Sequence, residues 1–216
     1  MFLKSPDGPM KLKVNGKKHS SIFIMAHGAG APMDSDWMND LTKNLTSREV
    51  QVIRFEFPYM VERRESGKKR PPNSKKVLLE SWREVIQTVR QSNPETPLFI
   101  GGKSMGGRIA SLIADEPEFK IQGLIGLGFP FHAPGKEPGD RITHLLDLKT
   151  STLIVQGTRD PMGTKEDSLS YPLSKAIQFC WLEDGDHSWK PRKKSGFDLQ
   201  GHMEKASEAI INFMRN

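Results

Sequence analysis

Short runs of consecutive apolar residues recur along the chain, separated by segments whose apolar residues follow a helical spacing. The runs cover residues 22–26, 50–55, 98–101, 121–127, 152–157 and 177–182. Each is too short for a helix and is typical of a parallel strand buried on both faces. Together with the helical segments, the last over 201–216, they predict an α/β fold with a mostly parallel, doubly wound sheet. Residues 10–14 indicate a further strand at the edge of the sheet.

Length and composition favour one domain over residues 1–216. Hydrophobic residues make up 36% of the chain and charged residues 27%, a balance typical of globular proteins. Charged residues and prolines interrupt the first apolar residues at once, so neither a signal peptide nor a membrane span is expected. The single cysteine, Cys180, cannot form an internal disulfide and fits a reducing compartment. We therefore expect a cytoplasmic protein.

The net charge of +6 is concentrated in one segment. Residues 62–76 hold seven basic and two acidic side chains. The surrounding segment 58–76 also contains Pro71 and Pro72, and it is predicted to be a basic flexible loop. No aromatic residue lies within the basic run, so nucleic-acid binding is not expected. The loop is either simply solvated or a flap that raises the local concentration of anionic acyl substrates.

Gly102 and Gly106 flank Ser104 in a G-x-S-x-G pattern that lies between a predicted strand and a predicted helix. Such a turn holds its serine at a strained backbone angle, so that the hydroxyl projects above the sheet. The glycines remove side chains that would collide with the neighbouring elements. Ser104 is therefore the predicted nucleophile, and the backbone N–H of Met105, at the start of the helix, is a predicted donor to the oxyanion.

Asp160 and His187 each follow a later predicted strand, so they are expected at the same edge of the sheet as Ser104. His187 is predicted to be the general base and Asp160 the acid that orients it. Asp184 and Asp186 are alternative acids, although they lie very close to His187. The other histidines considered as bases are His19, His132, His144 and His202. We expect no metal ion or cofactor, because no group of His, Cys and carboxylate residues has a ligand spacing.

A loop of small residues, His27-Gly28-Ala29-Gly30, ends the first buried strand. Its backbone can approach a substrate closely, and either Ala29, which we prefer, or Gly30 would supply the second oxyanion donor. His27 is expected to hydrogen-bond the backbone of this loop rather than to act as a base. The residues predicted to line the substrate pocket are His27, Gly28, Gly30, Phe131 and His132.

The chain resembles the α/β-hydrolase superfamily over nearly its whole length. The resemblance rests on residues 27–31, 101–108, 128–132, 156–160 and 185–187, and on the order Ser104, Asp160, His187. It is similar to a small branch that contains dienelactone-hydrolase-like bacterial proteins and the hydrolase-like domain of a chromatin NSL-complex subunit. No long helical segment lies between Gly128 and Thr152, so a minimal fold without a large helical cap is expected.

This resemblance implies a serine hydrolase that cleaves a small ester or related acyl bond through an acyl-enzyme. Its expected partner is a small-molecule acyl substrate. The alternative is a non-catalytic interaction module on a hydrolase scaffold, which would bind a protein partner, because a fold does not dictate one function.

Overall fold

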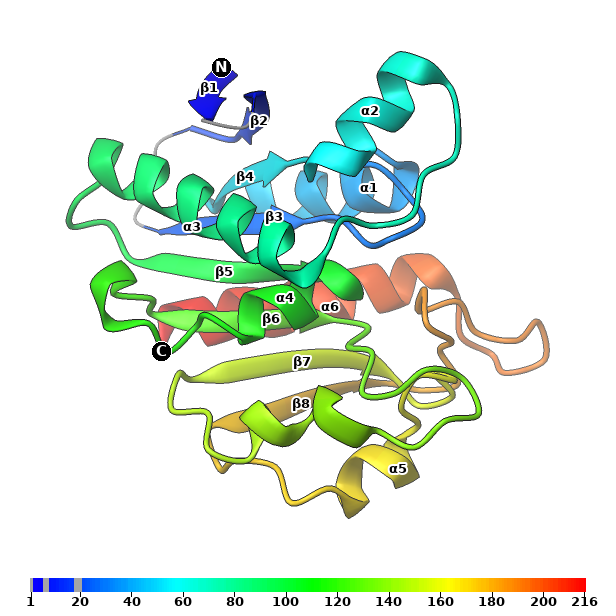
Figure 1. The fold of residues 1–216 in the computed structure, drawn as a ribbon. Helices are drawn as coiled ribbons and strands as arrows, with labels where there is room; N and C mark the ends of the chain where they lie inside the picture. The colour runs from blue at the N-terminus through cyan, green and yellow to red at the C-terminus, as the bar shows by residue number, and fades with distance from the viewer. Residues whose placement is uncertain (1, 6–7, 18–20) are drawn as a thin grey trace.

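The computed structural model describes residues 2–5, 8–17 and 21–216. These residues build an eight-stranded sheet with the strand order β1-β2-β4-β3-β5-β6-β7-β8 (Figure 1). The strands from β3 onward pair in parallel, whereas β1 and β2 pair antiparallel with their neighbours. Their bounds are β1 Phe2–Ser5, β2 Gly8–Asn15, β3 Ile22–Ala26, β4 Gln51–Phe55, β5 Leu98–Lys103, β6 Gly123–Leu127, β7 Thr152–Gly157 and β8 Ile177–Leu182.

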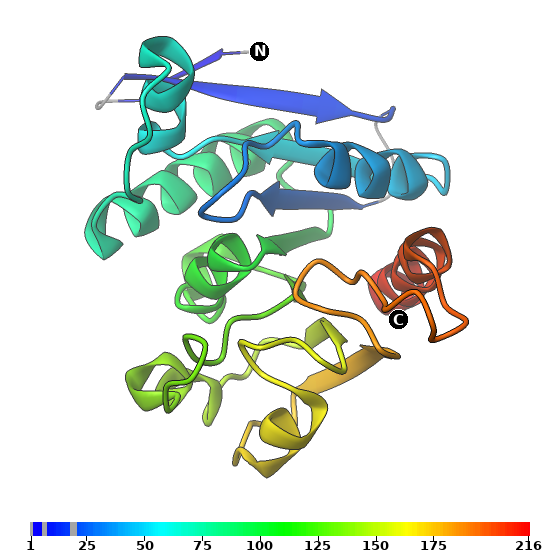
Figure 2. The same ribbon diagram turned by 90° about the vertical axis from the view of Figure 1, so that its right-hand side faces the viewer.

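Helices cover both faces of the sheet. Helices α1 and α6 pack together on one face, and α3 and α4 pack together on the other (Figures 1 and 2). Each face has its own cluster of buried apolar side chains, and the strands of the centre are buried on both sides. The helix bounds are α1 Asp36–Thr46, α2 Pro58–Ser66, α3 Lys75–Ser92, α4 Met105–Ser111, α5 Lys165–Ser170 and α6 Leu199–Arg215.

The predicted α/β architecture is confirmed, including the lack of a large cap. Between β6 and β7 the chain forms only two short 3₁₀ turns, η2 over Gly139–Arg141 and η3 over Thr143–Leu145. The strand expected over 10–14 is longer, and it lies between β1 and β4 rather than at the edge. No helix within the described ranges is long and apolar enough to cross a membrane.

The segment predicted to be a flexible loop is in part a helix, which corrects the expectation for 58–76. Helix α2 begins at Pro58 and ends at Ser66, and the following Gly67 has a φ of 66°, which suits a glycine just after a helix C-terminus. Its Tyr59 and Met60 are buried. The prediction of a flexible loop was wrong because it rested on the many charged residues of this segment, which suggested full solvation. The N-terminal residues of the segment instead pack into the core.

An ion pair also ties α2 to the rest of the fold. Arg64 donates to both carboxylate oxygens of the buried Glu56 at 2.8 Å, and it also pairs with Asp34. Glu56 in turn accepts a hydrogen bond from the backbone N–H of Met33 at 3.2 Å. Asp34 and Met33 belong to the loop between β3 and α1, so α2 is connected to the loop that follows the first buried strand.

We predict that Gly102→Ala lowers the free energy of unfolding by more than about 4 kcal/mol. A Cβ at Gly102 would lie 2.2 Å from the carbonyl oxygen of Ala26 on β3, and the φ of 147° is itself unfavourable for alanine. Urea denaturation measures the effect. The control is Gly30→Ala, whose Cβ would meet no atom within 4 Å. Equal stability of both variants would contradict this close approach of β5 to β3.

Candidate active site

Ser104 occupies a sharp turn between β5 and α4. Its φ of 49° and ψ of −117° are a strained conformation for a residue with a side chain. Its backbone N–H donates to the carbonyl of Leu127 on β6 at 2.9 Å, which holds the turn against the sheet. A Cβ at Gly106 would lie 2.7 Å from the carbonyl oxygen of His27. The turn therefore needs a glycine at this position, as the motif predicted.

His187 connects Ser104 to Asp160. The Nε2 atom of His187 lies 3.0 Å from Ser104 Oγ, and its Nδ1 atom lies 2.8 Å from Asp160 Oδ2. Because a carboxylate only accepts, Nδ1 carries the proton and Nε2 is free to accept the proton of the serine hydroxyl. The structure thus brings together three residues that the sequence placed after three different strands.

Asp160 is fully buried and held by two further donors. Its Oδ1 accepts from the backbone N–H of Met162 at 2.9 Å, and its Oδ2 accepts from Gln156 Nε2 at 3.0 Å. Gln156 also donates to the backbone carbonyls of Phe129 and Gly163. A buried carboxylate with several donors keeps one orientation, so it fixes the ring that it contacts.

The alternative acids have other partners. Asp184 binds Arg159 and Arg192, and the hydrogen bond from Arg192 lowers the pKa of this carboxyl to about 2. Asp186 Oδ1 accepts the backbone N–H groups of Ser188 and Lys190. Both residues therefore shape the loop that carries His187, whereas Asp160 contacts the imidazole.

The alternative histidines lie elsewhere. His132 faces Asp167 at 3.6 Å, His144 contacts Ser111 Oγ at 2.7 Å, and His202 contacts the carbonyl of Trp189. Burial lowers the pKa of His144 to about 4, with Arg108 as the next cause. His19 lies outside the described residues.

His27 fixes the small-residue loop from beneath. Its Nε2 accepts the backbone N–H of Phe57 at 3.2 Å, so its Nδ1 carries the proton and donates to the carbonyl of Gly28 at 2.7 Å. Burial lowers the pKa of His27, which keeps the ring neutral. In a trans peptide the N–H points away from the C=O, so His27 orients the N–H of Ala29.

Tyr59 of α2 orients the next peptide of the same loop. Its hydroxyl donates to the carbonyl of Ala29 at 3.1 Å, so it sets the direction of the N–H of Gly30. Ala29 and Gly30 are exposed at the surface of the loop, whereas Tyr59 is buried. Tyr59 was not among the predicted site residues, because its segment was expected to be a flexible loop.

A pocket of about 360 Å³ opens beside Ser104. It lies at the edge of the sheet where the strands from β3 onward end, the edge that faces the viewer in Figure 2. Its lining residues are Gly28, Ala29, Gly30, Ala31, Ser35, Trp37, Met38, Lys103, Ser104, Met162, His187 and Ser188.

The pocket corrects three predicted lining residues and adds others. His27 and Phe131 have no exposed surface and His132 is buried, so none of them lines it. Trp37 and Met38 are two of the added residues, and both belong to α1. Their place at the pocket depends on how α1 meets the loop after β8, which helical spacing does not reveal.

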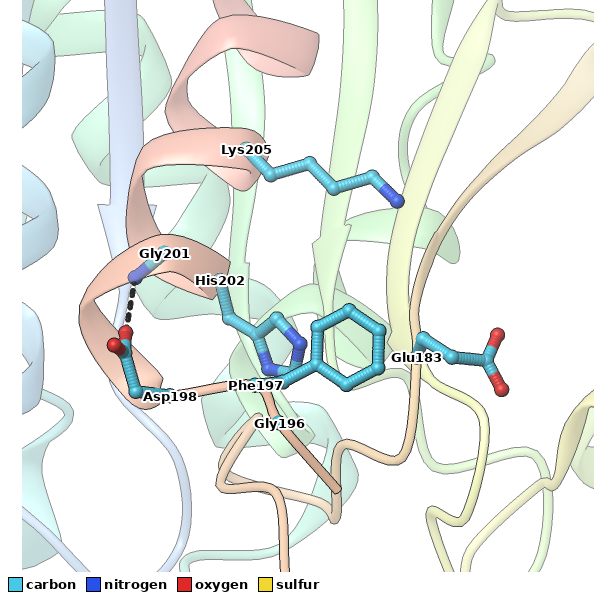
Figure 3. Close-up of a pocket in the computed structure, with 7 residues that line it drawn as sticks. All are labelled: Glu183, Gly196, Phe197, Asp198, Gly201, His202 and Lys205. Atoms are coloured by element: carbon cyan, nitrogen blue, oxygen red, sulfur yellow. Dashed lines mark hydrogen bonds between the residues drawn. The ribbon is translucent and has the colours of Figure 1, made fainter.

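A second hollow, of about 260 Å³, lies at the start of α6 (Figure 3). Asp198 accepts the N–H of Gly201 there, and Lys205 donates to the backbone carbonyl of Trp181 at 2.8 Å. None of the residues that line it belongs to the contacts around Ser104. Ser104 and His187 therefore line the pocket at the ends of the strands and not this second hollow.

Residues 19–215 match the family described as alpha/beta hydrolase domain. The chain belongs to this family. Comparison with curated proteins gave no match. The dienelactone-hydrolase-like resemblance is confirmed, whereas the resemblance to the NSL-complex subunit stays a prediction.

Solved structures share the fold of this α/β hydrolase. They include an alpha-beta serine hydrolase homologue from Coxiella burnetii, at 17% identity and a TM-score of 0.74, with 98% of this chain and 95% of that chain covered. A dienelactone hydrolase from Anabaena variabilis matches at 18% identity and a TM-score of 0.75, with 98% of this chain and 95% of that chain covered. An α/β serine hydrolase without lid from Xanthomonas campestris matches at 18% identity and a TM-score of 0.68, with 97% of this chain and 93% of that chain covered.

We predict that Asp160→Asn lowers kcat for an activated ester by about 10⁴-fold without loss of the fold. The amide would offer an N–H to Nδ1, which moves the imidazole proton to Nε2 and leaves no acceptor for Ser104. Steady-state kinetics and circular dichroism measure both effects. Asp186→Asn is the matched control, because its remaining oxygen can still accept the loop N–H groups. A larger loss in the control would assign the acid to Asp186.

We also predict that Tyr59→Phe lowers kcat by about three- to tenfold with little change in KM. The hydroxyl donates to the loop that would hold the oxyanion, and one neutral hydrogen bond contributes about 1 kcal/mol. The control is Tyr171→Phe, the other tyrosine of the chain. Unchanged kcat in Tyr59→Phe would show that the loop keeps its conformation without this contact.

Proposed function

We propose that this α/β hydrolase cleaves a small ester or related acyl bond through a covalent acyl-Ser104 intermediate. The observation that carries the proposal is the continuous series of contacts from Ser104 Oγ through His187 to the buried Asp160. The strained turn and the pocket beside the serine support it, because together they expose the hydroxyl to a substrate.

In the first half of the proposed reaction, Ser104 Oγ forms a bond to the carbonyl carbon of the substrate. His187 Nε2 takes the hydroxyl proton as the bond forms, and Asp160 stabilises the resulting imidazolium. The negative charge moves to the carbonyl oxygen, which accepts hydrogen bonds from the N–H of Met105 and from Ala29 or Gly30. Met105 opens α4, so its N–H has no partner within the helix and is available to the oxyanion.

The proton on His187 then passes to the leaving alcohol, and the bond between the carbonyl carbon and the alcohol oxygen breaks. A water molecule takes the place of the alcohol and attacks the acyl-enzyme, with His187 again accepting a proton. Release of the carboxylic acid restores Ser104. Each step uses the same imidazole in alternating roles, which is why its position relative to Oγ decides the rate.

The pocket favours a small acyl substrate with an apolar group. Its wall combines the side chains of Ala31, Trp37, Met38 and Met162, and its volume of about 360 Å³ lies near the lower end of small-molecule sites. Within the part of the chain that the structure describes, no large cap covers the pocket, so the part of the substrate that extends from it meets solvent.

We predict that Ser104→Ala abolishes hydrolysis of p-nitrophenyl acetate and butyrate above the background of free imidazole. The hydroxyl points into the pocket, so the variant should keep the thermal stability of the wild type or exceed it. A fluorophosphonate probe with mass spectrometry should label wild-type Ser104 and leave the variant unlabelled.

Heat-denatured wild type is the control for non-specific labelling. Full labelling of Ser104→Ala would contradict the assignment of the nucleophile. A folded wild type that neither reacts with the probe nor hydrolyses any ester of the panel would favour the interaction module instead.

A further inference from the structure

The loop that carries His187 is held by side chains from three different elements. Three consecutive backbone carbonyls accept these contacts: His187 from Lys103 on β5 at 2.5 Å, Ser188 from Trp37 on α1 at 3.1 Å and Trp189 from His202 on α6 at 2.6 Å. Figure 3 shows His202 on α6 beside the ring of Phe197. Three hydrogen bonds to adjacent carbonyls restrict the conformations that this loop can adopt.

Lys103 differs from the other two donors because it adjoins the nucleophile in the chain. It is the last residue of β5, and the next residue is Ser104. Its hydrogen bond therefore connects the backbone of His187 to the residue that directly precedes Ser104. The position of His187 is thereby tied to the position of the turn.

The ammonium group of Lys103 packs closely against the residue that follows β6. A Cβ at Gly128, where β6 ends, would lie 2.7 Å from both Lys103 Nζ and the carbonyl oxygen of His187. The ring of Trp37 lies 5.6 Å from Nζ, a distance at which a cation is attracted to an aromatic face. Glycine at position 128 is thus what allows the contact between Lys103 and His187.

We propose that Lys103 is a positioning residue for acyl transfer, whose ammonium group holds the carbonyl of His187 and thereby keeps the imidazole at Ser104 Oγ. The inference rests on the proposed function. A hydrogen bond from a charged donor is about twice as strong as one between neutral groups, so the charge matters as well as the contact. An imidazole displaced by about 1 Å costs up to about a hundredfold in rate.

The charge of Lys103 can be titrated in an accessible range. Burial lowers its pKa to about 8, against the opposing influence of Asp160 and Asp186. These carboxylates come from the loops after β7 and β8, the ring of Trp37 comes from α1, and His187 itself contributes the carbonyl. Near neutral pH the amine is therefore charged, and it loses its proton as the pH rises through about 8.

The decisive variants are Lys103→Met and Lys103→Arg, measured with p-nitrophenyl butyrate. Lys103→Met keeps the length of the side chain without the donor, so kcat should fall by about ten- to a hundredfold while KM stays within about twofold. Lys103→Arg should recover part of this loss. Lys165→Met is the matched control, because Lys165 lies over Trp181 at 6.0 Å, away from the pocket, and its loss should leave kcat unchanged.

A pH profile separates positioning from simple packing. In the wild type kcat should decline above pH 8, and in Lys103→Arg this decline should be absent, because guanidinium stays charged. Folding lowers the pKa of Lys103 from its usual 10.5 to about 8. Between these two pH values the amine of Lys103 is therefore protonated in the unfolded chain and largely deprotonated in the folded protein. The contribution of Lys103 to the free energy of unfolding therefore rises with pH over this range. Unfolding caused by the titration of Lys103 cannot explain the decline of kcat above pH 8.

If Lys103→Met fails to fold, the pH profiles of kcat for the wild type and Lys103→Arg still test the positioning role. Loss of kcat by less than about twofold in a folded Lys103→Met, or an identical alkaline decline in Lys103→Arg, would overturn the positioning role. Equal losses in the Met and Arg variants with lowered melting temperatures would also overturn it and indicate packing. Labelling of wild-type Ser104 by fluorophosphonate in the same experiment shows that the proposed function holds independently of Lys103.

Discussion

The close approach of β5 to β3 is the constraint on which the site depends. Where the two strands end, the chain turns into α4 so tightly that carbonyl oxygens of Ala26 and His27 fill the space in which side chains of Gly102 and Gly106 would lie. Ser104, between these glycines, is left with a positive φ and with its hydroxyl above the sheet. The strain is balanced by the packing of the sheet around it, which holds the turn in place.

His187, the proposed base, is positioned by a different physical means. His187 lies on an irregular loop, and loops have few backbone partners of their own. Here side chains of the surrounding elements supply the missing donors, and a buried carboxylate holds the ring. Ser104, the proposed nucleophile, thus lies on a rigid turn and faces an imidazole whose loop is attached to the same turn. This attachment limits the range of the distance between the hydroxyl and the imidazole.

The loop of small residues after β3 owes its shape to residues outside it. His27 and Tyr59 each bind one of its carbonyls, and the pair of Arg64 and Glu56 connects α2 to the same stretch of chain. Helix α2 thereby supports the part of the site that would hold the oxyanion. Its basic residues look like a solvated run in the sequence, yet Arg64 pairs with a buried carboxylate and Arg70 pairs with Glu62.

The sequence by itself determined the parallel strands from β3 onward, the turn at Ser104 and the order of the candidate residues, because apolar periodicity and flanking glycines are local signals. Only the tertiary structure decided which aspartate contacts His187, that Phe131 and His132 are buried away from the pocket, and that Lys103 binds a carbonyl 84 residues further along the chain. Such contacts join loops that follow different strands. They are set by the strand order and by long-range packing, which no local pattern encodes.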